Sequence, residues 1–296
     1  MGKVKTRKTA EQRQAEMNEL HEQIATKVEE LRDTEQWKTF LRWAAAFRSY
    51  SFSNVLLIWS QMPEATHVAG FQAWKKLGRQ VTKGQRGIRI LGGRQFTTTE
   101  EDEETGEENT RRGVRFFPCS VFDISQTEPM EGYEEPEDIA APLTGADPQG
   151  IAQAVADWLT VEGWTVSFEP VPGPANGFTE YSGTDRPGRV VVDSDMEPAQ
   201  QAKTAIHEAG HAMLHGPGSQ AAERGTRETE AESVAFVVGG LLGLDTTDYS
   251  VGYVGGWSGA DSALIRSTAQ NVVRAASTIY DGITAQVDED TEPAAA

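Results

Sequence analysis

A cluster of histidines constrains this chain more than any other feature of its sequence. Three of the five histidines fall within nine residues, as an H-E-A-G-H motif at 207–211 and as His215. In a helix, residues four apart lie one above the other on one face. The imidazoles of His207 and His211 can therefore converge on one Zn²⁺, and Glu208 lies beside that metal, where it can take a proton from bound water. The motif predicts a metal site with two histidine ligands and Glu208 as the catalytic base.

A catalytic zinc also needs a third protein ligand and one open position. Two glutamates four residues apart, Glu228 and Glu232, share one face of a second predicted helix, and Glu230 points elsewhere. We predict Glu228 as the ligand. Glu232 is predicted to accept the other ring N–H of a ligating histidine, a contact that fixes the orientation of the ring. The reverse assignment of these two glutamates stays open.

Hydrolysis of a peptide bond further needs a donor for the developing oxyanion. Tyr253, in a Y-V-G-G-W segment, is our candidate for this catalytic role, and His215 and Tyr249 are alternatives. Packing in the core or in a turn is the competing interpretation of the tyrosines, and capping of a helix end is that of His215.

The net charge of −18 hides a division along the chain. Residues 1–98 hold 17 Lys and Arg against 9 Asp and Glu, whereas residues 99–296 hold 10 against 36. A basic segment attracts phosphate, and an acidic segment is repelled by it. The two parts are therefore expected to have different roles, and only the first is a candidate for binding nucleic acid.

Binding of single-stranded DNA without sequence preference needs cations along the backbone and aromatic faces that stack on bases. The first part has nine aromatic residues between 37 and 74, followed by a basic run. Most aromatics of a small domain belong to its core, so the group rather than any one member carries this prediction, and no pattern for reading duplex DNA is present. The predicted contacts are Arg48, Asn54, Trp74, Lys75, Lys76, Arg79, Lys83, Arg86 and Arg89.

The hydrophobic pattern predicts an α+β chain of two domains. Domain 1–126 packs helices on a small sheet and carries an acidic loop at 99–112; a linker at 127–148 follows. Domain 149–284 places the zinc helix beside a short antiparallel sheet, and residues 285–296 form a disordered acidic tail. The expected helices are 8–34, 35–47, 53–61, 149–160, 198–215, 226–243 and 261–282, and the expected strands are 88–90, 114–124, 164–169, 177–181 and 189–193.

The single cysteine, Cys119, excludes an internal disulfide framework and a cysteine-rich zinc finger, and suits a reducing cytosol. No segment approaches the roughly 18–20 apolar residues of a membrane span. The basic N-terminus lacks the apolar core of a signal peptide. We therefore expect a cytoplasmic protein with no membrane partner.

Two parts of the sequence resemble known families. HEAGHAMLH followed by ETEAESVAF resembles the minimal zinc-peptidase domain of the ImmA/IrrE type. YSFSNVLLIWSQMPEATHVAGFQAWKKLGRQVTKGQRGIRIL, closed by VFDISQT, resembles the N-terminal domain of ArdC-type antirestriction proteins, and YVGGW before the last helix is similar to the final segment of that family. The resemblance covers about 10–125 and 150–282.

The resemblance implies a single-stranded-DNA-binding domain joined to a minimal zincin-like metallopeptidase domain. It implies His207, His211 and Glu228 as zinc ligands, Glu208 as the base, and protection of incoming DNA from restriction by a protein of mobile elements. Three functions stay open. The first is a DNA-binding zinc peptidase with an unknown protein substrate. The second is a non-catalytic shield of single-stranded DNA with structural zinc. The third is a regulatory peptidase whose first half docks a protein partner.

Overall fold

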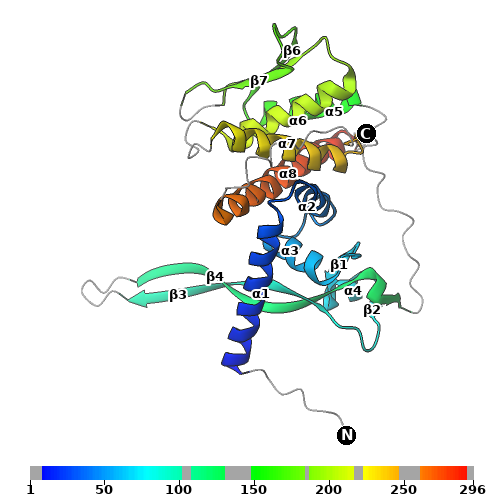
Figure 1. Cartoon of the computed structure of the whole chain (residues 1–296), viewed down its shortest axis with the longest axis vertical. Coiled ribbons are helices and arrows are strands. Elements are labelled where there is room, and N and C mark those ends of the chain that lie inside the picture. Colours follow the sequence, from blue (N-terminus) through cyan, green and yellow to red (C-terminus); the bar gives the residue numbers. More distant parts are fainter. Residues whose placement is uncertain are drawn as a thin grey trace, which may run out of the picture. The chain divides into compact units, whose positions relative to one another are not determined.

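The computed structural model is described here as two compact units, each taken by itself (Figure 1). Within 98–101, 108–113, 148–149 and 286–291 only the backbone is described. The residues that the structure describes are 9–101, 108–130, 148–183, 187–216, 223–246 and 261–291.

The first unit, Met1–Lys27 with Ser53–Glu135, is built on antiparallel strand pairing. Three strands form a sheet in the order β1-β4-β3, and β2 pairs with β5. The elements are α1 (Ala10–Glu30), α3 (Phe52–Gln61), β1 (Val68–Gly70), α4 (Phe71–Lys76), β2 (Arg79–Val81), β3 (Ile88–Glu101), β4 (Glu108–Asp123), the short 3₁₀ helix η1 (Ile124–Gln126) and β5 (Thr127–Pro129).

The hairpin of β3 and β4 is longer than the sequence predicts and forms the long ribbon in Figure 1. Backbone pairing runs from Ile88 opposite Val121 to Glu101 opposite Glu108. Of residues 99–112, expected as a solvated loop or a hairpin tip, 99–101 and 108–112 are paired strand at the far end of this hairpin. Strand is possible there because ladder hydrogen bonds need no buried side chains and the threonines at 97–99 favour extended backbone. Likewise, the start of the expected linker is strand β5.

Asp123, at the end of β4, is hydrogen-bonded to the loop before β1. Its buried carboxylate accepts the backbone N–H groups of Thr66 at 2.8 Å, His67 at 3.0 Å and Ser125 at 3.0 Å. The side chain of Gln126 accepts the N–H of Asp123 in return. Burial by itself raises the pKa of the Asp123 carboxyl, but these donors outweigh it, so the pKa lies below its ordinary value of 3.8.

We expect Asp123→Asn to lower the free energy of unfolding by about 1–3 kcal/mol, because an amide NH₂ would face N–H donors in a buried site. Since the pKa of Asp123 is lower in the folded chain, its contribution is present above pH 3.8 and is lost as the pH falls through the lowered value. The difference from wild type in urea unfolding should therefore shrink in acid. Glu64→Gln, at an exposed carboxylate in the same loop, is the control; an equal loss there would contradict the assignment.

The second unit, Val28–Phe52 with Pro136–Ala296, contains the histidine motif. Its sheet has the order β6-β8-β7, with β6 parallel and β7 antiparallel to β8, so the sheet is mixed and not antiparallel as the sequence suggested. The elements are α2 (Thr34–Ala46), α5 (Pro148–Val161), β6 (Thr165–Glu169), β7 (Gly177–Glu180), β8 (Arg189–Asp193), α6 (Pro198–Leu214), α7 (Arg224–Leu241) and α8 (Ser262–Thr291).

Helix α6 is the central element of this unit. It contacts α5, α7 and α8 and the strands β7 and β8. Helix α8 extends to Thr291, into the predicted disordered tail. None of the helices in the described part of the chain has the length and apolarity that a membrane span requires.

The division into units differs from the predicted domains in one segment, Val28–Phe52, which was assigned to the first domain and packs with the second unit. The physical reason is the apolar face of α2, where Trp37, Phe40 and Leu41 are fully buried. Helix α2 packs on α7, and Trp37 Nε1 donates to Ser233 Oγ at 3.0 Å. The roles assigned to the two domains stay predictions.

If α2 is part of this core, Trp37→Ala should lower the free energy of unfolding by about 3–5 kcal/mol, the usual cost of deleting a buried aromatic ring. Urea unfolding of the full chain, followed by circular dichroism, measures the loss. Trp43→Ala is the matched control, because Trp43 is on the same helix and is partly exposed. Equal losses for the two variants would remove α2 from the core.

Candidate metal centre

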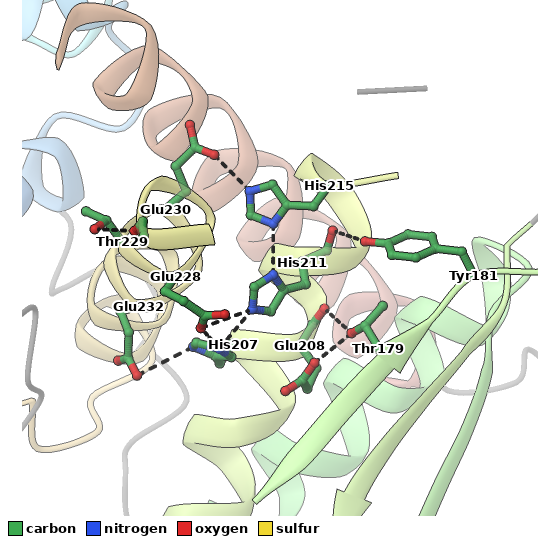
Figure 2. Close-up of polar contacts among 11 residues, drawn as sticks. Thr179, Tyr181, His207, Glu208, His211, His215, Glu228, Thr229, Glu230 and Glu232 are labelled. Carbon is green, nitrogen blue, oxygen red and sulfur yellow. Dashed lines mark hydrogen bonds and ion pairs between the residues drawn. The ribbon is translucent and has the colours of Figure 1, made fainter. Parts of the chain in front are cut away.

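Helices α6 and α7 bring together the three residues that the sequence predicts as metal ligands. Figure 2 shows the two imidazoles and the Glu228 carboxylate pointing toward one another. The Nε2 atoms of His207 and His211 lie 3.1 Å apart, and Glu228 Oε2 lies 3.6 Å from each. All three ligand atoms fall within 4.8 Å of one another. Ligand atoms around a tetrahedral zinc with bonds of about 2.0–2.1 Å lie about 3.3 Å apart. The triangle therefore has the size of a divalent metal site.

The close approach of the two helices depends on Gly210. A Cβ at this position would lie 3.3 Å from the Cα of Ala231 and 3.4 Å from the Cβ of Val234, both on α7. These contacts are tighter than ordinary van der Waals contact, so a glycine suits the crossing. The glycine inside the H-E-A-G-H motif therefore helps to set the distance between the histidines and Glu228.

The charges around the triangle favour a cation. The contacts with His207 and His211 hold the pKa of Glu228 well below its usual range. Burial lowers the pKa of His207, but the contact with Glu228 and the charges of Glu208 and Glu232 outweigh it, so the pKa of His207 is raised. Three carboxylates thus lie near two imidazoles, and this excess of negative charge favours a cation in the triangle.

Glu208 is buried beside the triangle, and strand β7 orients it. Thr179 Oγ1 donates to Glu208 Oε2 at 2.7 Å. A Cβ at Gly177 would lie 2.7 Å from the carbonyl oxygen of Val191 and 2.8 Å from a methyl group of Thr204, so only glycine lets this strand approach α6 so closely. Sequence reasoning missed both residues of β7, because nothing in a short strand signals which helix it will face.

Tyr181 and Glu232 lie on either side of the two histidines. Tyr181 donates its hydroxyl to the backbone oxygen of His211 at 2.7 Å. Burial, and then the charge of Glu208, raises the pKa of Tyr181 to about 12, so its hydroxyl keeps the proton at neutral pH. Glu232 Oε1 lies 3.6 Å from His207 Nδ1, the side that its predicted role requires, although the distance exceeds that of a hydrogen bond. Tyr253 and Tyr249 lie outside the described residues.

Glu230, which sequence reasoning placed away from the site, reaches it through His215. The Nδ1 atoms of His211 and His215 lie 2.8 Å apart, and His215 Nε2 lies 2.8 Å from Glu230 Oε2 (Figure 2). Asn271 of α8 donates to Glu230 Oε1 at 2.8 Å. His215 and Glu230 are both buried. His215 thus contacts both an imidazole of the triangle and a buried carboxylate, which the spacing of the motif alone could not reveal.

A cleft of about 630 Å³ opens over this group. Strand β7 and helices α6 and α7 line it, and its lining includes Glu208, the three predicted ligands and the cationic side chains of Lys203, Arg224 and Arg227. The triangle therefore lies in an open cleft.

In the first unit, the predicted DNA contacts separate into two groups. Trp74 is 5% exposed and its Nε1 donates to the backbone oxygen of Phe122, so its ring is not available to stack. Asn54 holds both backbone groups of Leu91. Arg79 donates a hydrogen bond to Thr127. Arg89 donates one to Ser120 and forms an ion pair with Glu16. The exposed members of the set are Lys75, Lys76, Lys83 and Arg86.

Arg48 belongs to the second unit. There it pairs with Asp281 and its guanidinium lies 4.7 Å from the ring centre of Tyr280. Arg48 is exposed and follows the end of α2, and its contact with DNA stays a prediction.

The β3–β4 hairpin exposes aromatic rings that sequence reasoning did not select. Phe96 is 41% exposed, Phe116 59% and Phe117 42%. The alternation of side chains along each strand puts Phe96 and Phe117 on one face and Phe116 on the other. The sequence held a signal for this exposure, namely phenylalanines within a charged segment. Such apolar side chains have little to pack against in an isolated hairpin.

Comparisons with known proteins match both parts of the chain. Residues 11–122 match the family model of the N-terminal domain of anti-restriction factor ArdC, and residues 160–248 match that of a peptidase family described as the IrrE N-terminal-like domain. An uncharacterized protein of Bacillus anthracis is 25% identical and is aligned over 86% of this chain and 48% of its own length. The chain therefore spans about half the length of this curated relative.

Two solved structures are also similar, the metal-free and Mn(II)-bound crystal structures of the antirestriction ArdC protein from plasmid R388. They are 21% and 20% identical, with TM-scores of 0.45 and 0.46. The alignments cover 79% and 85% of this chain and 85% and 98% of those chains. The two family matches fall on the basic N-terminal part and on the paired helices of the metal centre, so this chain carries a region similar to the ArdC N-terminal domain followed by a region similar to the IrrE N-terminal-like peptidase domain.

Proposed function

We propose that the second unit is a zinc-dependent peptidase whose active site is the cleft over α6 and α7. The observation that carries this proposal is the triangle of His207, His211 and Glu228 with Glu208 buried beside it. Two imidazole nitrogens and one carboxylate oxygen are the donor set of catalytic zinc sites, which leave one coordination position open.

A bound divalent ion would supply Lewis-acid polarisation of a peptide carbonyl and of a water molecule. Glu208 would accept the proton of the attacking water and pass it to the leaving amine as the C–N bond breaks. Thr179 holds one oxygen of that carboxylate at 2.7 Å, and so fixes the direction in which Glu208 can take a proton. In the part of the chain that the structure describes, β7 pairs with β8 alone, so its other edge would be the place for an extended peptide in the cleft.

Metal analysis and a casein-cleavage assay on the full chain test this function. Wild type should contain zinc, and His207→Ala should lose it. Glu208→Gln should keep the zinc and lose about 10²- to 10⁴-fold in hydrolysis, the usual contribution of a general base. Glu162→Gln, at an exposed carboxylate outside the cleft, is the control and should keep both.

The results separate the alternatives. Undiminished hydrolysis by Glu208→Gln would remove the catalytic assignment, and a metal-free wild type would remove the site itself. Full protection of DNA in cells by the same variant would favour a shield of single-stranded DNA with structural zinc.

We further propose that the first unit binds single-stranded DNA, and that the protein acts in antirestriction by protecting incoming DNA of mobile elements. The observation that favours this second function is one exposed face of the β3–β4 hairpin, which we call the Phe96–Phe117 face. Arg94 and Arg115 stand opposite each other between the two rings, and Arg115 lies 5.5 Å from the ring centre of Phe96. Such a face alternates stacking surfaces with cations.

The arrangement of the two arginines itself points to an anionic ligand. Like charges directly opposite each other destabilise a strand pair. In the part of the chain whose side chains are described, neither Arg94 nor Arg115 has an ion-pair partner. A phosphate between them would remove the repulsion. The acidic residues of the hairpin begin at Glu100, four residues or about 13 Å beyond Phe96. This distance exceeds the Debye length of about 8 Å at physiological salt, so salt screens a bound phosphate from their charge.

The binding of an oligothymidylate by the full chain, measured against salt concentration, tests this surface. The logarithm of the affinity should fall linearly, with a slope of about −0.7 per phosphate neutralised. Phe96→Ala/Phe117→Ala should weaken binding by about 1–3 kcal/mol per ring lost. Phe116→Ala is the matched control, because Phe116 is an even more exposed phenylalanine on the opposite face of the hairpin. A flat salt response would instead support a protein partner.

A further inference from the structure

The hydrogen-bonded chain His211–His215–Glu230–Asn271 is the strongest feature of the second unit that the proposed mechanism leaves unused. Its three links are each 2.8 Å long. It joins the motif helix α6 to α7 and α8. His215 is 7% exposed and Glu230 3%, so both are removed from solvent. Buried polar groups of this kind are costly unless every one of them is satisfied.

The positions of the protons follow from the acceptors. Asn271 Nδ2 donates to one oxygen of Glu230, and the other oxygen lies 2.8 Å from His215 Nε2. An ionised carboxylate can only accept hydrogen bonds. His215 must therefore carry a proton on Nε2. A neutral imidazole has one proton only, so His215 Nδ1 is an acceptor.

That acceptor decides the tautomer of His211. The two Nδ1 atoms are 2.8 Å apart, and one of them must donate to the other. Since His215 Nδ1 accepts, His211 Nδ1 carries the proton, and the lone pair of His211 lies on Nε2. This is the atom that faces His207 and Glu228 in the triangle. The opposite arrangement would leave a bare nitrogen of His215 against the carboxylate.

We propose that His215 and Glu230 are positioning residues that hold His211 in the tautomer and orientation in which its Nε2 atom binds the metal. The proposal rests on the metal site of the proposed function. An acceptor on the outer nitrogen of a ligating histidine raises the basicity of the ring and fixes its orientation. Here the acceptor is an imidazole, and the carboxylate acts one residue further out.

The two ligating histidines are thus held differently. His207 Nδ1 is buried and has no hydrogen-bond partner, and the nearest Glu232 oxygen of the ion pair is 3.6 Å away. His211 is fixed from behind by a continuous chain. The structure therefore assigns the stronger outer contact to His211, through His215 to Glu230. The contact of Glu232 with His207 is the weaker one.

The tautomer can be measured directly. The ¹⁵N shifts of imidazole-labelled, metal-free full chain report which nitrogen of His211 is protonated. Wild type should show His211 protonated on Nδ1. The double variant His215→Phe/Glu230→Leu removes both inner polar partners together, so that no unpaired charge stays buried, and should release His211 to the Nε2-protonated form. A merely structural role for the pair would not change this signature.

Zinc affinity gives the second readout, by competition with a chromophoric chelator. The double variant should bind Zn²⁺ about 10- to 100-fold more weakly than wild type. Glu230→Gln, which keeps an acceptor for His215 Nε2–H, should recover most of the affinity. Asn271→Leu removes the outermost hydrogen bond of the chain and the exposed bond that Asn271 accepts from Arg274, but it leaves His215 and Glu230 in place. It is the matched control and should bind nearly as wild type does.

The outcomes are distinguishable. Wild type protonated on His211 Nε2, or a double variant with unchanged zinc affinity, would overturn the positioning role while leaving the metal site intact. A wild type that binds no zinc would instead overturn the proposed function, and the positioning role with it. Thermal melting of the metal-free variants shows that they fold.

Discussion

The close crossing of α6 and α7 at Gly210 is the constraint on which the metal centre depends. Helix geometry alone places His207 above His211, but it leaves the third ligand undetermined. A Cβ at Gly210 would lie 3.3 Å from the Cα of Ala231, so a larger side chain would require a small local shift of α7, the helix that also carries Glu228. The apolar contact between the helices thus helps to determine the distance of 3.6 Å from Glu228 Oε2 to the Nε2 atom of each imidazole.

Around this crossing the unit buries more charge than a hydrophobic core ordinarily tolerates. Glu208, Glu230 and His215 are all nearly inaccessible to solvent. Each is matched with a partner at hydrogen-bond distance, Thr179 for Glu208 and the His215–Glu230 pair for the others. Breaking such a set one partner at a time is costly, whereas a fully satisfied set is rigid. Rigidity is what a ligand sphere needs, because a metal binds best to donors that are already in position.

The sequence contained the ligands of the candidate site but not its support. A four-residue spacing identifies His207 and His211, and a helix face limits the third ligand to Glu228 or Glu232, because both inferences use only local geometry. Thr179, Gly177 and the contact of Glu230 with His215 depend on how strand and helices pack, which no local pattern encodes. The same limit applies in the first unit. Trp74 lies beside a basic run and was predicted to stack on bases, but its ring is buried in the core. Phe96 and Phe117 are exposed, and only the structure shows this.

The two proposed functions are not separable along the chain at the linker. The ArdC family match, 11–122, runs through Val28–Phe52, yet this segment packs with the unit that holds the metal centre. Trp37 bonds Ser233 on α7, five residues from Glu228, so a segment of the N-terminal match supports the helix that carries the third ligand. A fragment cut at the linker would therefore remove part of the peptidase core along with the DNA-binding unit. For this reason, a loss of hydrolysis in such a fragment would not show that DNA binding controls the peptidase.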